Sequence, residues 1–97
     1  MKRSEINAHI KDAERFFADM GFRLPPWAFW GPGKWKGLKD TEVARNKLGW
    51  DITDYATGDF EKTGLILFTI RNGNLATGDP KTYAEKIMIV GENQICP

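Results

Sequence analysis

The segment from residue 64 to residue 73 reads GLILFTIRNG and is the clearest β-strand signal in the chain. From Leu65 to Arg71 apolar side chains occupy both alternating positions, a pattern typical of a strand covered on both faces. The dipeptide Asn72-Gly73 follows directly and predicts a hairpin turn, because both residue types tolerate a positive φ. We therefore expect the fold to be organised around a strand at residues 65–71.

Two further strands are expected on either side of this segment. Residues 50–55 alternate apolar and polar side chains, and so do residues 85–90. In the second of these, Ile87 and Ile89 share one face and Lys86 lies on the other. Turn-forming residues separate the three strands.

The first twenty residues predict an amphipathic helix. Its apolar residues recur three and four positions apart and form one stripe, made of Ile6, Ile10, Ala13, Phe17 and Met20. Ser4 is expected to cap the start of this helix, and Gly21 is expected to end it in a left-handed conformation. A short second helix is predicted from a cap at Asp40 or Thr41 to a stop at Gly49.

Residues 22–37 join the two helices and are rich in Pro, Gly and aromatic residues. The large rings would form an exposed apolar patch if this loop were solvated, so it is expected to lie against the rest of the protein. Together the elements predict an α+β fold, with N-terminal helices and an aromatic loop packed on an antiparallel β-sheet. At 97 residues, the chain is expected to form a single domain over residues 1–97.

The composition excludes several classes of function. Lys and Arg number 14 and Asp and Glu 13, a net charge of +1, which gives no field that would attract nucleic acid or an anionic membrane. The longest apolar run, residues 65–68, is too short to span a bilayer, and no signal peptide follows Met1. Cys96 is the only cysteine, which favours a reducing, cytoplasmic setting.

Trp27, Trp30 and Trp35 fall close together, with Lys34 and Lys36 beside them. An aromatic and basic surface of this kind can stack sugars or bases. The same residues can instead cover the core as a folded-back loop. Both interpretations stay open, and Trp27 and Trp30 are the candidate substrate-binding residues of the cluster.

The remaining polar residues give little chemistry. His9 is the only histidine, and a metal site needs three or four ligands, so no metal site is expected within this chain. Lys86 could anchor a sugar hydroxyl or stabilise an enediolate if its face of the strand lines a pocket, and otherwise it is a solvated lysine. Asp51 and Asp54 lie on opposite faces of their strand and form no catalytic pair.

Several blocks of sequence occur in one order along the chain. They are MKRSEIN at 1–7, FRLPPWA at 22–28, LGWDITD at 48–54, FEK at 60–62, GLILFTIRNG at 64–73 and YAEKIMIV at 83–90. This order resembles the N-terminal part of the D-lyxose isomerase family, over nearly the whole chain and least strongly at residues 38–46.

The resemblance implies the front part of a cupin-fold, cytoplasmic isomerase that interconverts D-lyxose and D-xylulose through an enediolate. In that family a divalent metal, often manganese, is held by three His and one Glu, of which the first two His form a His-x-His motif. That motif is expected where this sequence stops, at Pro97, and none of the four ligands has a counterpart here. The resemblance therefore implies a chain that is inactive alone, with Lys86 as the one position carried over to the substrate pocket.

Two other interpretations stay open. The chain could be a small carbohydrate- or partner-binding module that uses its Trp-rich loop. It could also be a non-functional truncated product, in which open sheet edges lead to self-association.

Overall fold

The computed structural model describes residues 1–37, 41–74, 76 and 78–97. Its elements, in chain order, are α1 (Arg3–Asp19), the 3₁₀ helix η1 (Pro26–Phe29), α2 (Pro32–Lys36), α3 (Glu42–Arg45), β1 (Gly49–Thr53), β2 (Leu65–Arg71) and β3 (Glu85–Ile89). Asp40, one of the two caps expected for the second helix, lies outside the described residues. Among the helices of the described residues, none has the length and apolar character needed to cross a membrane.

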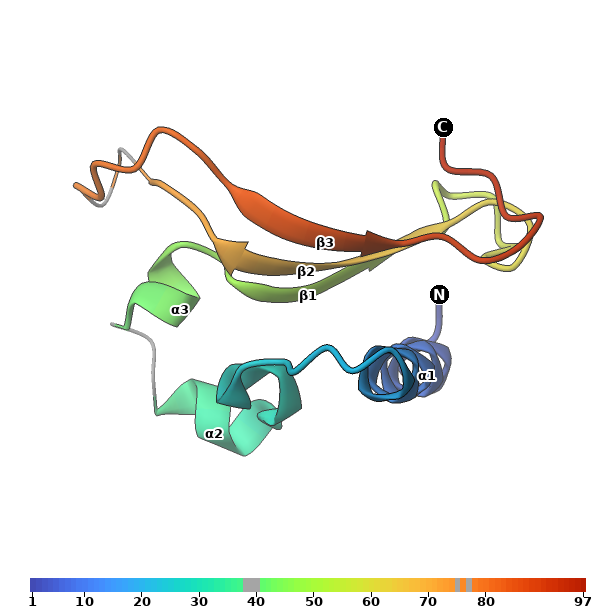
Figure 1. Cartoon of the computed structure of the whole chain (residues 1–97), viewed down its shortest axis with the longest axis horizontal. Coiled ribbons are helices and arrows are strands. Elements are labelled where there is room, and N and C mark those ends of the chain that lie inside the picture. Colours follow the sequence, from blue (N-terminus) through green and yellow to red (C-terminus); the bar gives the residue numbers. More distant parts are fainter. Residues whose placement is uncertain (38–40, 75, 77) are drawn as a thin grey trace.

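The strands form an antiparallel sheet in the order β1-β2-β3, so β2 is central and the other two strands are its edges. Figure 1 shows α1 and α2 on one side of this sheet. The predicted α+β architecture, with helices and an aromatic connection packed on an antiparallel sheet, is confirmed. Within the described residues the other face has no helical layer and Leu65 and Leu67 are only half-buried, so the expectation that β2 is covered on both faces is wrong for this chain.

The core lies between β2 and the helical layer and is built from rings. Phe68 is fully buried and pairs across the sheet with Trp50 and Ile87. The Trp50 ring stands edge-on to Phe68 with centroids 5.0 Å apart, and it stacks on Phe17 of α1 at 5.9 Å. Trp27 covers Phe68 from η1 at 6.5 Å. Aromatic pairs at these spacings and angles add to the stabilisation that comes from burial alone.

The stripe of α1 meets the sheet over only part of its length. Ala13 and Phe17 are buried, whereas Ile6 and Ile10 are half-buried. Met20, the last member of the predicted stripe, is 69% exposed and follows the last residue of α1. The centre of the predicted stripe is therefore the part that packs.

The two ends of α1 differ in how well the sequence predicts them. The helix begins one residue before Ser4, with Lys2 in the capping position and no side-chain bond to the free amides, so the predicted Ser4 cap is wrong. Gly21 has a φ of 74° and ends the helix as predicted. The Phe22 N–H then donates to the Phe17 carbonyl at 2.8 Å, the bond that closes a Schellman motif.

The second helix, α3, is shorter than expected. It ends at Arg45, and Lys47 rather than Gly49 takes the left-handed conformation, with a φ of 56°. The Leu48 N–H donates to the Val43 carbonyl at 3.0 Å, again closing a Schellman motif. Gly49 already belongs to β1, where its φ of 102° is a conformation that L side chains rarely adopt.

Three smaller differences concern boundaries. The connection at 22–37 contains two short helical segments, each with Pro in its first turn, where the sequence predicted only loop. β1 ends at Thr53 rather than residue 55, since Tyr55 and Ala56 both take positive φ. β3 ends at Ile89, one residue before the predicted limit.

Asn72-Gly73 does not form the predicted hairpin turn. Neither residue takes a positive φ, and thirteen residues, 72–84, separate β2 from β3. The Asn72 side chain instead donates to the carbonyl of Asn46 at 3.1 Å, which ties this connection to the end of α3. The tertiary bond therefore replaces the local turn that the dipeptide favours.

A polar network holds the same connection in place. Lys81 Nζ donates to Glu42 at 2.7 Å and to Asp79 at 3.2 Å. Asp79 also accepts from the amide of Asn46, which is 2% exposed, at 2.8 Å. The Asp79 carboxylate also accepts from the Lys81 backbone N–H, and this hydrogen bond is the main reason that the pKa of Asp79 is lowered. The hydrogen bond to the Glu42 carboxylate is the main reason that the pKa of Lys81 is raised.

This network should give the protein a specific loss of stability in acid. Because the pKa of Asp79 lies below its ordinary value of 3.8 in the folded state, its contribution is complete above that value and is lost as pH falls through the folded-state pKa. The pKa of Lys81 is raised above its ordinary value of 10.5 in the folded state. The stabilisation that Lys81 contributes is therefore complete below pH 10.5 and is lost as pH rises through the folded-state pKa. Urea unfolding of wild type and Asp79→Asn should therefore differ in midpoint at neutral pH and converge as pH falls through the folded-state pKa of Asp79. Glu61→Gln is the control, and a difference that persists unchanged in acid would contradict the assignment.

Candidate functional site

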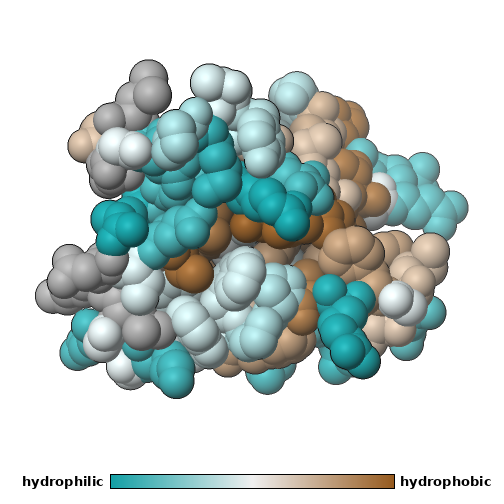
Figure 2. Space-filling view, turned by 60° about the vertical axis from the view of Figure 1, so that its left-hand side comes forward, coloured by the Kyte–Doolittle hydropathy of each residue, from teal (hydrophilic) through white to brown (hydrophobic). Residues whose placement is uncertain are grey.

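A groove of about 690 Å³ lies between α1, the η1–α2 segment and β1. Four indole rings, Trp27, Trp30, Trp35 and Trp50, line it together with Ile6, Ile10, Ala28, Leu48 and Ile52. Arg3, Lys36 and Asp51 are its charged members. We call this feature the tryptophan groove. Figure 2 shows hydrophobic side chains gathered in a hollow between two more hydrophilic layers of the molecule.

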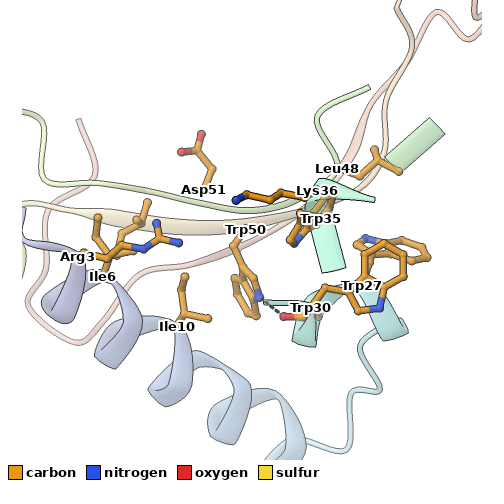
Figure 3. Close-up of a pocket in the computed structure, with 12 residues that line it drawn as sticks. Arg3, Ile6, Ile10, Trp27, Trp30, Trp35, Lys36, Leu48, Trp50 and Asp51 are labelled. Atoms are coloured by element: carbon orange, nitrogen blue, oxygen red, sulfur yellow. Dashed lines mark hydrogen bonds between the residues drawn. The ribbon is translucent and has the colours of Figure 1, made fainter. Parts of the chain in front are cut away.

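The inner wall of the groove is fixed by the core. Trp50 begins the apolar face of β1, and its ring is held between Phe17 and Phe68. Its indole Nε1 donates to the carbonyl of Ala28 at 2.9 Å, drawn as the dashed line in Figure 3. Because both the ring and the N–H have partners, Trp50 forms a rigid surface at the base of the groove.

The opposite wall comes from the η1–α2 segment. Trp30 and Trp35 meet edge to face, with centroids 5.4 Å apart and planes at 72°. The Lys34 ammonium lies 5.7 Å from the centroid of the Trp30 ring, within the range of a cation–π contact. Both indoles remain half-buried, so part of each ring faces the groove or solvent.

Two cations lie at the mouth of the groove. In Figure 3 the side chains of Arg3, from α1, and Lys36, from α2, extend toward one another across the space above Trp50. Asp51 points to the other side of β1, as strand alternation from Trp50 requires. In the part of the chain that the structure describes, Arg3, Lys36 and Asp51 make no ion pair with any residue.

The indole of Trp27 differs from the other three in that its buried Nε1–H lacks a hydrogen-bond partner among the described residues. A buried N–H without a partner is unfavourable by about 1–3 kcal/mol. Trp27 also packs on Phe68, so it serves the core as well as the groove.

Lys86 does not belong to this groove. It pairs with Thr69 across the sheet and is exposed. By strand alternation it shares a face with Met88, opposite to the face on which Ile87 and Ile89 pack on the core. The structure therefore brings Trp27 and Trp30 together and leaves the third candidate residue, Lys86, on the other side of the sheet.

The described residues do not fit the metal site that the sequence resemblance implies. His9, the one histidine, is half-buried and packs its ring against Phe60 at 4.2 Å. Within residues 1–37, 41–74, 76 and 78–97, no three His, Cys, Asp or Glu side chains are placed to hold a metal ion. A catalytic manganese would need ligands that this part of the chain does not provide.

Sequence reasoning missed part of the groove. The cluster of Trp27, Trp30 and Trp35 is visible in the sequence because its members are close together. Trp50 and Arg3 join it only through the packing of β1 and α1. The sequence indicated only that Trp50 lies on the apolar face of a strand. It did not indicate which segments would pack against that face.

Comparison with known proteins adds evidence of a different kind. The family model described as D-lyxose isomerase matches residues 1–97. The D-lyxose/D-mannose isomerase of Escherichia coli O157:H7 is 44% identical over 102 residues, which cover 100% of this chain and 44% of that protein. The enzyme of the same name from Serratia proteamaculans is 43% identical over the same shares. The chain thus spans less than half the length of these relatives, and its match to them and to the family model shows that it belongs to the D-lyxose isomerase family.

Proposed function

We propose that this chain provides the helical layer and the first strands of an aldose–ketose isomerase that interconverts D-lyxose and D-xylulose. The match of the family model to the whole chain carries the proposal. The relatives' names, D-lyxose/D-mannose isomerase, support a monosaccharide substrate. A cytoplasmic setting belongs to the same proposal, because the only cysteine, Cys96, has no thiol partner within the chain.

Aldose–ketose isomerisation moves a proton between C1 and C2 of the sugar. The reaction needs a base for that proton and a positive group for the developing enediolate oxygen. Lys86 is the residue of this chain that we assign to the substrate side, since it is a solvated cation on the sheet face opposite α1 and α2. Within the described residues no three His, Cys, Asp or Glu side chains are placed to hold the metal that the family resemblance implies, and the Lys81, Asp79 and Glu42 side chains are paired with one another. We therefore assign the proton transfer to residues outside these 97.

The proposal predicts that the 97 residues alone give no sugar turnover above background. Purified chain with manganese and D-lyxose should form no D-xylulose, measured by a coupled ketose assay. The E. coli relative has a further part that follows the region matched by this chain. Adding that part should restore turnover, because the groups that transfer the proton would then be present. Lys86→Met should lower this restored rate by about tenfold or more.

The control is the E. coli relative itself, divided at the same place. Recovery of activity from its two halves would show that such a division is tolerated. The proposed function is wrong if the two halves of the E. coli relative recover activity and the mixture of this chain with the second half does not. Turnover by the 97-residue chain alone would equally overturn the assignment of the proton transfer to residues outside it.

A further inference from the structure

We propose that the tryptophan groove is a binding site for the ring of a neutral aldose, separate from the Lys86 face of the sheet. The choice of an aldose rests on the proposed function, whereas the presence of a ligand site rests on the groove itself. The groove combines the volume of a ligand pocket with aromatic walls and with hydrogen-bonding groups along its edge.

The size and lining of the groove match a small-molecule site. Its volume of about 690 Å³ falls within the range of roughly 300–1,000 Å³ typical of ligand pockets, which are mostly apolar with a few polar groups. The walls at Trp30 and Trp35 are half-buried rather than packed away. Half-buried indole faces offer flat, apolar surfaces on which a ring can stack.

The polar groups of the groove lie together at its mouth. Arg3 and Lys36 make no ion pair within the described residues, so their N–H groups are available to a ligand. β1 is an edge strand, and an edge strand presents unpaired backbone N–H and C=O groups. Its residues Trp50, Asp51 and Ile52 line the groove in succession. The mouth therefore offers donors and acceptors on one side of an apolar floor.

This combination selects a ring with apolar faces and a hydroxylated rim. A purely apolar ligand would remove Arg3 and Lys36 from water without replacing their hydrogen bonds, which is costly. An acyclic polyol offers hydroxyls but no flat C–H face for the indoles. A pyranose offers both, since its hydroxyls donate and accept at the rim while its C–H groups stack on the aromatic wall. D-Mannose and D-lyxose are the relevant probes, because the relatives' names contain both sugars.

The site is independent of catalysis at the Lys86 face. Trp50 and Lys86 lie on opposite faces of one sheet, so a sugar in the groove cannot contact Lys86. The groove site should therefore respond to substitutions at α2 and η1 and remain unaffected by changes at Lys86. This separation also distinguishes its failure from failure of the proposed function, because binding is measured here without turnover.

The experiment is a titration of the 97-residue chain with D-mannose and D-lyxose, followed by the indole N–H signals in ¹H–¹⁵N spectra. We expect saturable shifts of the Trp30 and Trp35 signals, and no saturable shift with D-mannitol, the acyclic counterpart. Trp30→Leu and, separately, Lys36→Met should each weaken binding by roughly tenfold, the effect of losing one stacking or charged contact. The matched controls, Phe29→Leu and Lys62→Met, should leave binding within about twofold.

Circular dichroism identifies any variant that fails to fold, and Lys36→Met tests the site even if Trp30→Leu unfolds, because Lys36 is exposed. Three results would overturn the proposal. They are the absence of saturation by either sugar in a folded chain, an equal response to D-mannitol, or binding that Lys86→Met abolishes and Lys36→Met leaves intact.

Discussion

Phe68→Ala should lower the free energy of unfolding by about 3–5 kcal/mol, as truncation of a fully buried aromatic residue does. Phe68 has no exposed surface and contacts Trp27 and Trp50, so the lost ring would leave a cavity between the sheet and the helical layer. A domain of this size has a total stability near the lower end of about 5–15 kcal/mol. The variant should therefore be largely unfolded under conditions in which the wild type is folded.

Urea unfolding followed by tryptophan fluorescence measures this effect, since Trp27 and Trp50 both report on the Phe68 environment. Leu67→Ala is the matched control. Leu67 is the adjacent residue of β2, half-buried on the sheet face opposite α1 and α2, and its truncation should cost less than about 2 kcal/mol. Equal losses in the two variants would show that the core does not lie on the helical side of β2.

Gly73→Ala should be the second strongly destabilising change, at a cost of about 3 kcal/mol. A Cβ at Gly73 would overlap the backbone carbonyl oxygen of Lys81 and lie 2.8 Å from its carbonyl carbon. Those atoms cannot rotate away as a side chain could, so the backbone at Gly73 or at Lys81 must shift. The shift would also pull Lys81 from Asp79 and Glu42, the network that ties this connection to α3.

Gly33→Ala is the control for this prediction, because the same substitution should have the opposite sign there. Apart from its chain neighbours and the backbone of α2 itself, no atom of the described residues lies within 4 Å of the position that a Cβ at Gly33 would occupy. Alanine in a helix is favoured over glycine by up to about 1 kcal/mol, so α2 should become slightly more stable. Thermal unfolding of the two variants gives the comparison, and a neutral Gly73→Ala would contradict the described packing of Gly73 on Lys81.

The family and the α+β class were accessible from sequence for different reasons. The strand at Leu65–Arg71 was predicted with its bounds, because an apolar run of that length beside turn residues has few alternatives. Gly21 was predicted as the end of α1, because glycine lacks the Cβ that makes a positive φ unfavourable for other residues. The family resemblance rested on ordered blocks of residues, and the comparisons confirm it over residues 1–97.

Asn72-Gly73 illustrates where local reasoning fails. The dipeptide has the local chemistry of a hairpin turn, but the side chain of Asn72 bonds to Asn46, which is far away in sequence. Lys47 is the reverse case, a residue with no preference for positive φ that adopts it at the end of α3. Each outcome is decided by contacts between segments, whose energy exceeds the local preference of one or two residues.

The sequence by itself determined the central strand, the existence of α1 with its apolar stripe, the α+β class and membership of the family, whereas which part of that stripe packs was decided by the tertiary structure. Only the tertiary structure placed Trp50 and Arg3 beside Trp30 and Lys36, and only it put Lys86 on the opposite side of the sheet from them. The physical reason is the range of the interactions. Helix and strand periodicity depends on neighbours a few residues apart, whereas a groove depends on how three separate segments pack against one another.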